Sequence, residues 1–140
     1  MEVKLAPGAR LPTRGSDNAA GYDLYALDAV WLSPQKATLV STGVSMAIPN
    51  GYYGRIAPRS GLALKGIDVF GGVIDSDYRG EIKAILAFSS PDPEAEFAIT
   101  SGMKIAQIIF EKHYVFDFGP VTEFSDLTTR GEGGFGSTGN

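Results

Sequence analysis

The sequence contains no cysteine and a single histidine, His113, among its 140 residues. Without thiols the chain can form neither a disulfide framework nor a thiolate metal site, and this composition suits a reducing compartment. A histidine-based metal site or a Ser-His-Asp triad would rest on His113 alone, and we expect that residue on the surface. The remaining metal donors are carboxylates, which suit a hard cation such as Mg²⁺.

Long apolar runs and a basic excess are also missing. No stretch approaches the ~20 apolar residues of a membrane span, and the first eight residues lack the apolar centre of a signal peptide. We therefore expect a soluble intracellular protein, of the cytoplasm or the nucleus, without membrane association. The net charge of -4 also argues against stable nucleic-acid binding, which draws on a basic surface. A small anionic ligand held by a few arginines remains compatible with this charge.

Glycine and proline are abundant, with 18 and 8 residues, and they divide the chain into pieces too short for a helical domain. Valine, isoleucine, tyrosine and phenylalanine dominate between these breaks, which favours strands. One short helix is predicted at residues 60–65, capped by Ser60 and ended by Gly66. We predict one all-β domain, a sandwich or jelly roll, with strands at residues 3–5, 20–26, 31–32, 37–40, 44–48, 52–57, 82–88, 97–100 and 105–110.

The stretch GGVIDSDYRGE at residues 71–81 concentrates chemistry in few positions. Its first glycines let a main chain approach a ligand, and the following Val-Ile pair anchors a strand, so we predict a β-hairpin with a functional tip. In an extended chain Asp75 and Asp77 share one face, and either could serve as a general base, while Tyr78 points the other way. An aspartate-rich surface turn is the alternative interpretation.

Three further features suggest a phosphate ligand. Arg59 precedes the predicted helix, where free N–H groups would form an anion site, although an ordinary capped turn explains it too. Gln107 interrupts an apolar strand, as a satisfied core amide or as a ligand contact. Residues 130–140 are too rich in glycine to pack a core, and we expect them to be disordered without ligand. Residues 131–136 fit G-x-G-x-x-G, but no helix can follow, which rejects a dinucleotide fold. Arg130 and Phe135 would instead suit a lid over a nucleoside triphosphate.

Five stretches together resemble, in order and spacing, the five motifs of the trimeric dUTPase family. They read AGYDLYA at residues 20–26, APRSGLA at 57–63, GVIDSDYRGE at 72–81, GMKIAQ at 102–107 and RGEGGFGSTG at 130–139. The resemblance implies a β-clip type jelly-roll domain at residues 1–129 in a homotrimer, and a tail at 130–140 that closes over a neighbouring subunit's active site. It also implies hydrolysis of dUTP to dUMP and pyrophosphate with Mg²⁺, which limits uracil incorporation into DNA and supplies dUMP for dTMP synthesis.

The resemblance also assigns roles that the residues alone leave open. It makes Asp75, rather than Asp77, the base that activates water, and it puts the Tyr78 ring under the deoxyribose, where a 2′-hydroxyl would collide. Asp23 is implied near the water shell of a metal that the substrate phosphates mainly hold. The other implied substrate-binding residues are Arg59, Ser60, Gly61 and Gln107 for the phosphates, Gly72, Val73 and Ile74 for uracil, Lys83, and Arg130, Phe135, Gly136, Ser137 and Thr138 of the tail.

One departure concerns the fourth motif, where Met103 and Lys104 replace the usual acidic residue and arginine. Any ion pair made there is lost or altered, because lysine cannot reproduce the planar fork of arginine. Two alternatives to the hydrolase are a dCTP deaminase, which shares the fold, and a non-catalytic dUTP-gated binding module. The complete third and fifth motifs favour the hydrolase.

Overall fold

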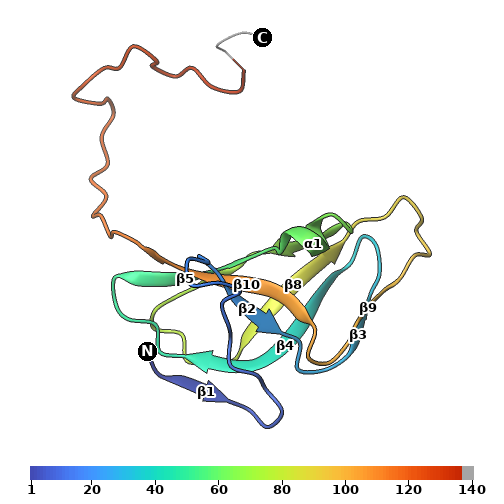
Figure 1. Cartoon of the computed structure of the whole chain (residues 1–140). Helices are drawn as coiled ribbons and strands as arrows, with labels where there is room; N and C mark the ends of the chain where they lie inside the picture. Colours follow the sequence, from blue (N-terminus) through green and yellow to red (C-terminus); the bar gives the residue numbers. More distant parts are fainter. Residues whose placement is uncertain (137–140) are drawn as a thin grey trace.

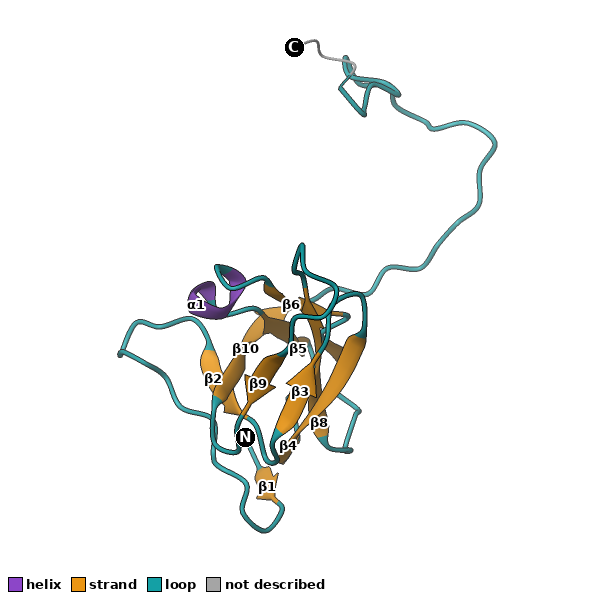
Figure 2. Ribbon diagram, turned by 90° about the vertical axis from the view of Figure 1, so that its right-hand side faces the viewer, coloured by secondary structure: helices purple, strands orange, loops and turns teal. Residues whose placement is uncertain are grey.

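Two four-stranded antiparallel sheets and a two-stranded ribbon make up the computed structural model, which describes residues 1–136 (Figures 1 and 2). The first sheet has the order β1 (Val3–Leu5), β4 (Ala37–Met46), β8 (Ile82–Phe88) and β6 (Ile67–Phe70). The second has the order β2 (Tyr22–Tyr25), β10 (Lys104–Lys112), β5 (Tyr52–Ala57) and β7 (Val73–Ile74). The ribbon pairs β3 (Val30–Leu32) with β9 (Phe97–Ile99), and the helix α1 spans Ser60–Ala63. The predicted all-β jelly roll with one short helix is confirmed.

A single hydrophobic core joins the two large sheets. In β8, Ile82, Ala84 and Leu86 are buried while Lys83 and Ile85 between them are not, which is the two-residue period of a sheet with one face inward. Fully burying one such large aliphatic side chain contributes about 1.5–3 kcal/mol. The core takes members from both sheets, including Leu24, Ile56, Ile105 and Ile108 from the second and Val40, Val44, Ile82 and Leu86 from the first.

The predicted break between residues 40 and 44 is wrong, because β4 continues through it. The pairing of β4 with β8 shifts register between Ser41 and Val44, so the extra residues form a bulge rather than a turn. Gly43 takes a φ of 70°, and its N–H donates to Glu81 Oε1 at 2.8 Å. The buried Thr42 hydroxyl donates to the Ile82 carbonyl at 2.6 Å. These bonds satisfy polar groups that a bulge would otherwise leave unpaired.

The predicted β-hairpin at residues 71–81 is also wrong. Its two flanking strands lie in different sheets, because β7 pairs with β5 whereas β8 pairs with β4 and β6. Gly71 and Gly72 have φ values of 65° and 98° and turn the chain from β6 to β7. A Cβ on Gly72 would lie 2.6 Å from the Ile56 carbonyl oxygen, so only glycine fits there. Residues 75–81 therefore connect the two sheets, and we call this segment the acidic loop.

The helix begins at Ser60, one residue earlier than a Ser60 cap would require. Arg59 is the N-cap residue with extended backbone, and no side chain caps the helix, because arginine has no side-chain oxygen to accept an N–H. The Arg59 carbonyl accepts from the N–H groups of Leu62 and Ala63. Gly66 follows α1 with a φ of 82° and accepts the Ser89 N–H at 2.8 Å. The helix ends at Ala63 with Leu64 as its C-cap residue, so the predicted helix over residues 60–65 is two residues too long at this end, and the predicted cap by Ser60 is wrong.

The chain from residue 113 to 136 forms no helix or strand and runs away from the sheets (Figures 1 and 2). Within the described residues, no helix is long and apolar enough to cross a membrane. Eight large apolar side chains of this segment are exposed, namely Tyr114, Val115, Phe116, Phe118, Val121, Phe124, Leu127 and Phe135. The domain boundary predicted between residues 129 and 130 stays a prediction.

Candidate active site

The acidic loop is held in shape by its own hydrogen bonds. Residues 75–78 form a turn closed by the Tyr78 N–H, which donates to the Asp75 carbonyl at 3.2 Å. The Tyr78 hydroxyl donates to the Glu81 carbonyl at 2.9 Å, and Arg79 Nη1 donates to the Ser76 carbonyl at 2.6 Å. The guanidinium therefore secures the loop rather than facing a ligand. Both carboxylates, of Asp75 and Asp77, are exposed.

Two cavities meet at Asp75. The smaller one, of about 320 Å³, joins Asp75 to Tyr78 and Lys83, and its apolar side is made by Leu39 and Ile85 of the first sheet. It also includes Val73 and Ile74, so the structure brings together most of the predicted third-motif site and Lys83. Lys83 Nζ lies 3.5 Å from Glu81 Oε2.

The second cavity, of about 480 Å³, places Tyr53 and His113 beside Asp75 and Asp77. The Tyr53 and His113 rings meet edge to face with centroids 6.2 Å apart. His113 is exposed, as predicted, but its place next to the acidic loop was not predicted from the sequence. Its position follows from the pairing of β5 with β10, which ends one residue before His113.

The residues that were predicted to bind phosphate lie close together at the opposite end of β5. Arg59 follows this strand, and its Nε donates to Asp23 Oδ1 at 3.0 Å. Lys104 Nζ lies 2.8 Å from the other oxygen of Asp23, and the Asp23 side chain is only 13% exposed. Asp23 thus bridges two cations, and the hydrogen bond from Lys104 to Asp23, together with the charge of that carboxylate, raises the pKa of Lys104 above the ordinary value.

Gln107 supports the chain directly before Arg59. Its Nε2 donates to the carbonyl of Pro58 at 3.0 Å, directly before Arg59. A Cβ on Gly21 would collide with the Gln107 side chain, so the glycine makes room for the amide. Ser60 and Gly61 are exposed at the start of α1.

The structure does not bring the two groups together within one chain. Ile74 pairs with Gly54, which places Asp75 opposite Tyr53. Arg59 lies six residues after Tyr53, two residues beyond the end of β5. At ~3.3 Å per residue, the carboxylate and the guanidinium are anchored about 20 Å apart. Arg130 and Phe135 lie in the segment after β10, where Arg130 Nε donates to the Gly133 carbonyl at 2.8 Å and Phe135 is fully exposed. Gly136 is exposed there too, and the predicted Ser137 and Thr138 lie outside the described residues.

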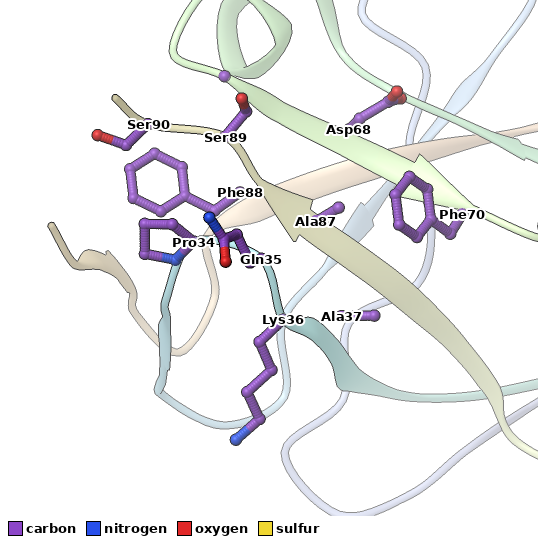
Figure 3. A pocket seen from close by; sticks show the side chains of 11 residues that line it. Pro34, Gln35, Lys36, Ala37, Asp68, Phe70, Ala87, Phe88, Ser89 and Ser90 are labelled. Atoms are coloured by element: carbon purple, nitrogen blue, oxygen red, sulfur yellow. The ribbon is translucent and has the colours of Figure 1, made fainter. Parts of the chain in front are cut away.

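A further cavity of about 440 Å³ lies elsewhere on the first sheet, between the chain before β4 and the end of β8 (Figure 3). Phe70, Phe88 and Pro34 line it, together with Lys36 and Asp68. None of the predicted site residues belongs to it. Its shape alone gives no reason to place the reaction there.

The fold defines an all-β protein. Its candidate site residues, in the acidic loop and in the cluster around Arg59, lie mainly on the turns between strands. The sequence model of the dUTPase family matches residues 8–139, and the chain belongs to this family. It is 53% identical over 137 residues to the deoxyuridine 5'-triphosphate nucleotidohydrolase of Paramecium bursaria Chlorella virus 1, covering 97% of this chain and 94% of that protein. The vaccinia virus (strain Copenhagen) protein of that name is 47% identical, with 98% and 90% covered.

Solved structures agree with the sequence comparison. A mutant dUTPase of Staphylococcus bacteriophage 80alpha, with dUpNHpp, superposes with a TM-score of 0.93 at 28% identity, covering 99% of this chain and 98% of that one. A mutant dUTPase of phage phi11 of S. aureus, described for the coordination of a structural Mg(II) ion, gives a TM-score of 0.78 at 28% identity, covering 89% and 98%.

Proposed function

We infer that the protein hydrolyses dUTP to dUMP and pyrophosphate. Its family and its full-length relatives named as deoxyuridine triphosphate nucleotidohydrolases support this reaction. The structural observation that carries the inference is the cavity shared by Asp75, Tyr78 and β7, which unites a candidate base, a ring and accessible main chain. A nucleoside with its α-phosphate near the carboxylate fits these elements.

The main chain of β7 is suited to reading uracil. This strand ends the sheet order, so within residues 1–136 only one of its edges is paired, with β5. Its outer N–H and C=O groups can bond to the edge of a base as a neighbouring strand would. The Tyr78 ring lies in the same cavity and would stack under the deoxyribose, leaving no space for a 2′-hydroxyl.

Asp75 is the general base of this proposal. Its carboxylate takes a proton from a water molecule, the water oxygen bonds to the α-phosphorus, and the bond from that phosphorus to the bridging oxygen breaks to release pyrophosphate. The choice of Asp75 over Asp77 rests on the family pattern and on the cavities, since Asp75 lines both and Asp77 only one.

The phosphates would be held by Arg59, Ser60, Gly61 and Gln107, and we assign these residues to a different copy of the chain. A water on Asp75 must be within about 3–3.5 Å of the α-phosphorus, whereas Arg59 of the same chain is anchored about 20 Å away along β5. A site that uses both groups therefore needs two copies. The tail with Arg130 and Phe135 would then close over the site of a neighbouring copy, with Ser137 and Thr138 on the phosphates.

The first sheet offers a surface for the homotrimer. Leu39, Ile85 and Phe70 lie in register across β4, β8 and β6, and all three are large, apolar and exposed. Such a row on a soluble protein marks a contact surface. Leu39 and Ile85 also line the cavity of Asp75, so copies that meet on this row would approach the acidic loop. We assign the row to the contact between three copies.

Asp23 is the protein residue that fits a magnesium site. It offers carboxylate oxygens, which Mg²⁺ prefers, but both already contact cations, so a contact through the water shell suits it better than direct ligation. When bound, Mg²⁺ would neutralise charge on the substrate phosphates. We place the reaction inside the cell, in the cytoplasm or the nucleus, where deoxynucleotides are made and used.

Pyrophosphate release from dUTP, UTP, dTTP and dCTP tests the proposed function. We expect release from dUTP alone at an appreciable rate. Ammonia from dCTP would instead establish the deaminase, and tight dUTP binding without release of pyrophosphate would establish the binding module.

A further inference from the structure

Asp23 is held by two cations that approach different oxygens. Oδ1 accepts from Arg59 Nε at 3.0 Å, and Oδ2 lies 2.8 Å from Lys104 Nζ. The strand register explains the second contact. Lys104 pairs with Tyr25, and Asp23 lies two residues from Tyr25 on the same face of β2. The Lys104 side chain is 41% exposed, so its ammonium reaches Asp23 from the solvent side.

The Arg59 guanidinium is fixed by the same two residues. Besides the bond to Asp23, its Nη1 donates to the carbonyl of Lys104 at 3.4 Å. The structure gives Nη2 no acceptor among residues 1–136, and the Arg59 side chain is 33% exposed. Nε and Nη1 are thus engaged with the protein, and the Nη2 amino group is left for a ligand.

A carboxylate and a guanidinium with no competitor tend to form two parallel hydrogen bonds. Such a fork would draw both Asp23 oxygens to Arg59 and would occupy Nη2. In the structure Oδ2 instead contacts Lys104 Nζ, and the guanidinium makes a single bond to Oδ1. The three side chains together carry one net positive charge, next to the Ser60-Gly61 turn.

We propose that Lys104 is a positioning residue, which restricts Asp23 to a single bond with Arg59 and thereby keeps Arg59 available to the substrate phosphates. This inference rests on the proposed role of Arg59 in phosphate binding. It also gives a function to the lysine that replaces the usual arginine of the fourth motif. Lys104 acts through Arg59 and does not itself contact the phosphates.

Binding of the uncleavable analogue dUpNHpp and of dUMP, measured by calorimetry, tests the proposal. Lys104→Met keeps the length of the side chain and removes its charge, and we expect about 5–30-fold weaker binding of dUpNHpp, with KM raised and kcat little changed. Binding of dUMP should change by less than about threefold, because it lacks the outer phosphates. Lys104→Arg should restore dUpNHpp binding to within about threefold, since it keeps a cation at this place. Lys4→Met, on the distant β1, is the matched control.

A double-mutant cycle separates this proposal from the assignment of Arg59. In an Arg59→Met background, Lys104→Met should cause no further loss, because its effect passes through Arg59. An equal loss in both backgrounds, or unchanged dUpNHpp binding by Lys104→Met, would overturn the positioning role. If Arg59→Met alone binds dUpNHpp normally, the assignment of Arg59 itself is wrong. Lys104→Gln replaces the methionine variant if the latter does not fold.

Discussion

At the scale of single residues, the proposed hydrolysis depends on where the acidic loop places Asp75 and Tyr78. An acidic pair, a ring and glycines in one short stretch suggested a functional site, but an aspartate-rich surface turn explained them as well, and the resemblance over five motifs decided between the two. It could not choose between the two aspartates, since their same-face placement assumed an extended chain. The turn at residues 75–78 invalidates that assumption, and only the cavities and the family pattern separate Asp75 from Asp77.

Replacing Asp75 by asparagine should separate binding from turnover. The amide keeps the shape of the side chain but cannot accept the water proton, so we expect near-normal dUpNHpp binding and turnover lowered about 10²–10⁴-fold. Single-turnover pyrophosphate release and calorimetry measure the two quantities. Asp77→Asn is the matched control, and a loss of turnover confined to that variant would move the base to Asp77.

Tyr78 should control sugar selection. Tyr78→Ala removes the ring that would collide with a 2′-hydroxyl, and we expect the ratio of UTP to dUTP hydrolysis to rise about tenfold. Tyr78→Phe retains the ring and loses only the bond to the Glu81 carbonyl, so its ratio should match the wild type. An unaltered ratio in the alanine variant would refute the role of the ring.

At the scale of elements, most strands were predictable and their partners were not. Strands β1, β5 and β8 match the predicted residues, because glycine and proline mark their ends. The misplaced break in β4 shows the limit of this signal, since Gly43 serves a bulge and not a turn. Similarly, the contact between Asp23 and Lys104 joins distant parts of the sequence, and only the β2–β10 register reveals it.

The pairing of β5 with β10 brings Tyr53 and Arg55 into contact with Glu111. Glu111 accepts from Arg55 Nη2 at 3.0 Å and from the Tyr53 hydroxyl, and these bonds lower the pKa of Glu111 below its ordinary 4.5. A depressed carboxyl pKa stabilises the fold above the unfolded value and ceases to do so as pH falls through the folded one. The thermal midpoint of Glu111→Gln should therefore lie below that of the wild type at pH 7, and the gap should shrink below pH 4.5.

The exposed Glu96→Gln is the control for this experiment. We expect little difference between its thermal midpoint and that of the wild type at either pH. A gap for Glu111→Gln that stays constant across the acid range would show that Glu111 acts by packing alone, without the charge-assisted bonds.

At the scale of the whole molecule, the proposed active site needs residues from more than one copy of the chain. The acidic loop and the Arg59 cluster lie at opposite ends of β5, and residues 113–136 expose large apolar side chains away from the sheets. The family resemblance predicted the trimer and the tail from the sequence. The residues alone suggested a lid over a nucleoside triphosphate but not the trimer, because an interface between copies leaves no periodic signal in one chain.

Removing residues 130–140 should leave a folded trimer with little activity. In the proposed site the tail acts as a lid and makes no part of the core, so we expect an unchanged thermal midpoint and mass in light scattering, with kcat/KM lowered by about two orders of magnitude. Dissociation of the trimer on truncation would show that the tail is needed for assembly, which contradicts the proposed role of the tail as a lid.

Activity of mixed assemblies tests most directly whether each site is shared between copies. Asp75→Asn and Arg59→Met should each be nearly inactive alone. When equal amounts are unfolded together and refolded, random assembly pairs an intact Asp75 with an intact Arg59 in about a quarter of the sites, so about a quarter of the wild-type pyrophosphate release should return. If no activity returns from the mixture, while wild type refolded in the same way recovers, the two groups act within one chain and the shared site is wrong.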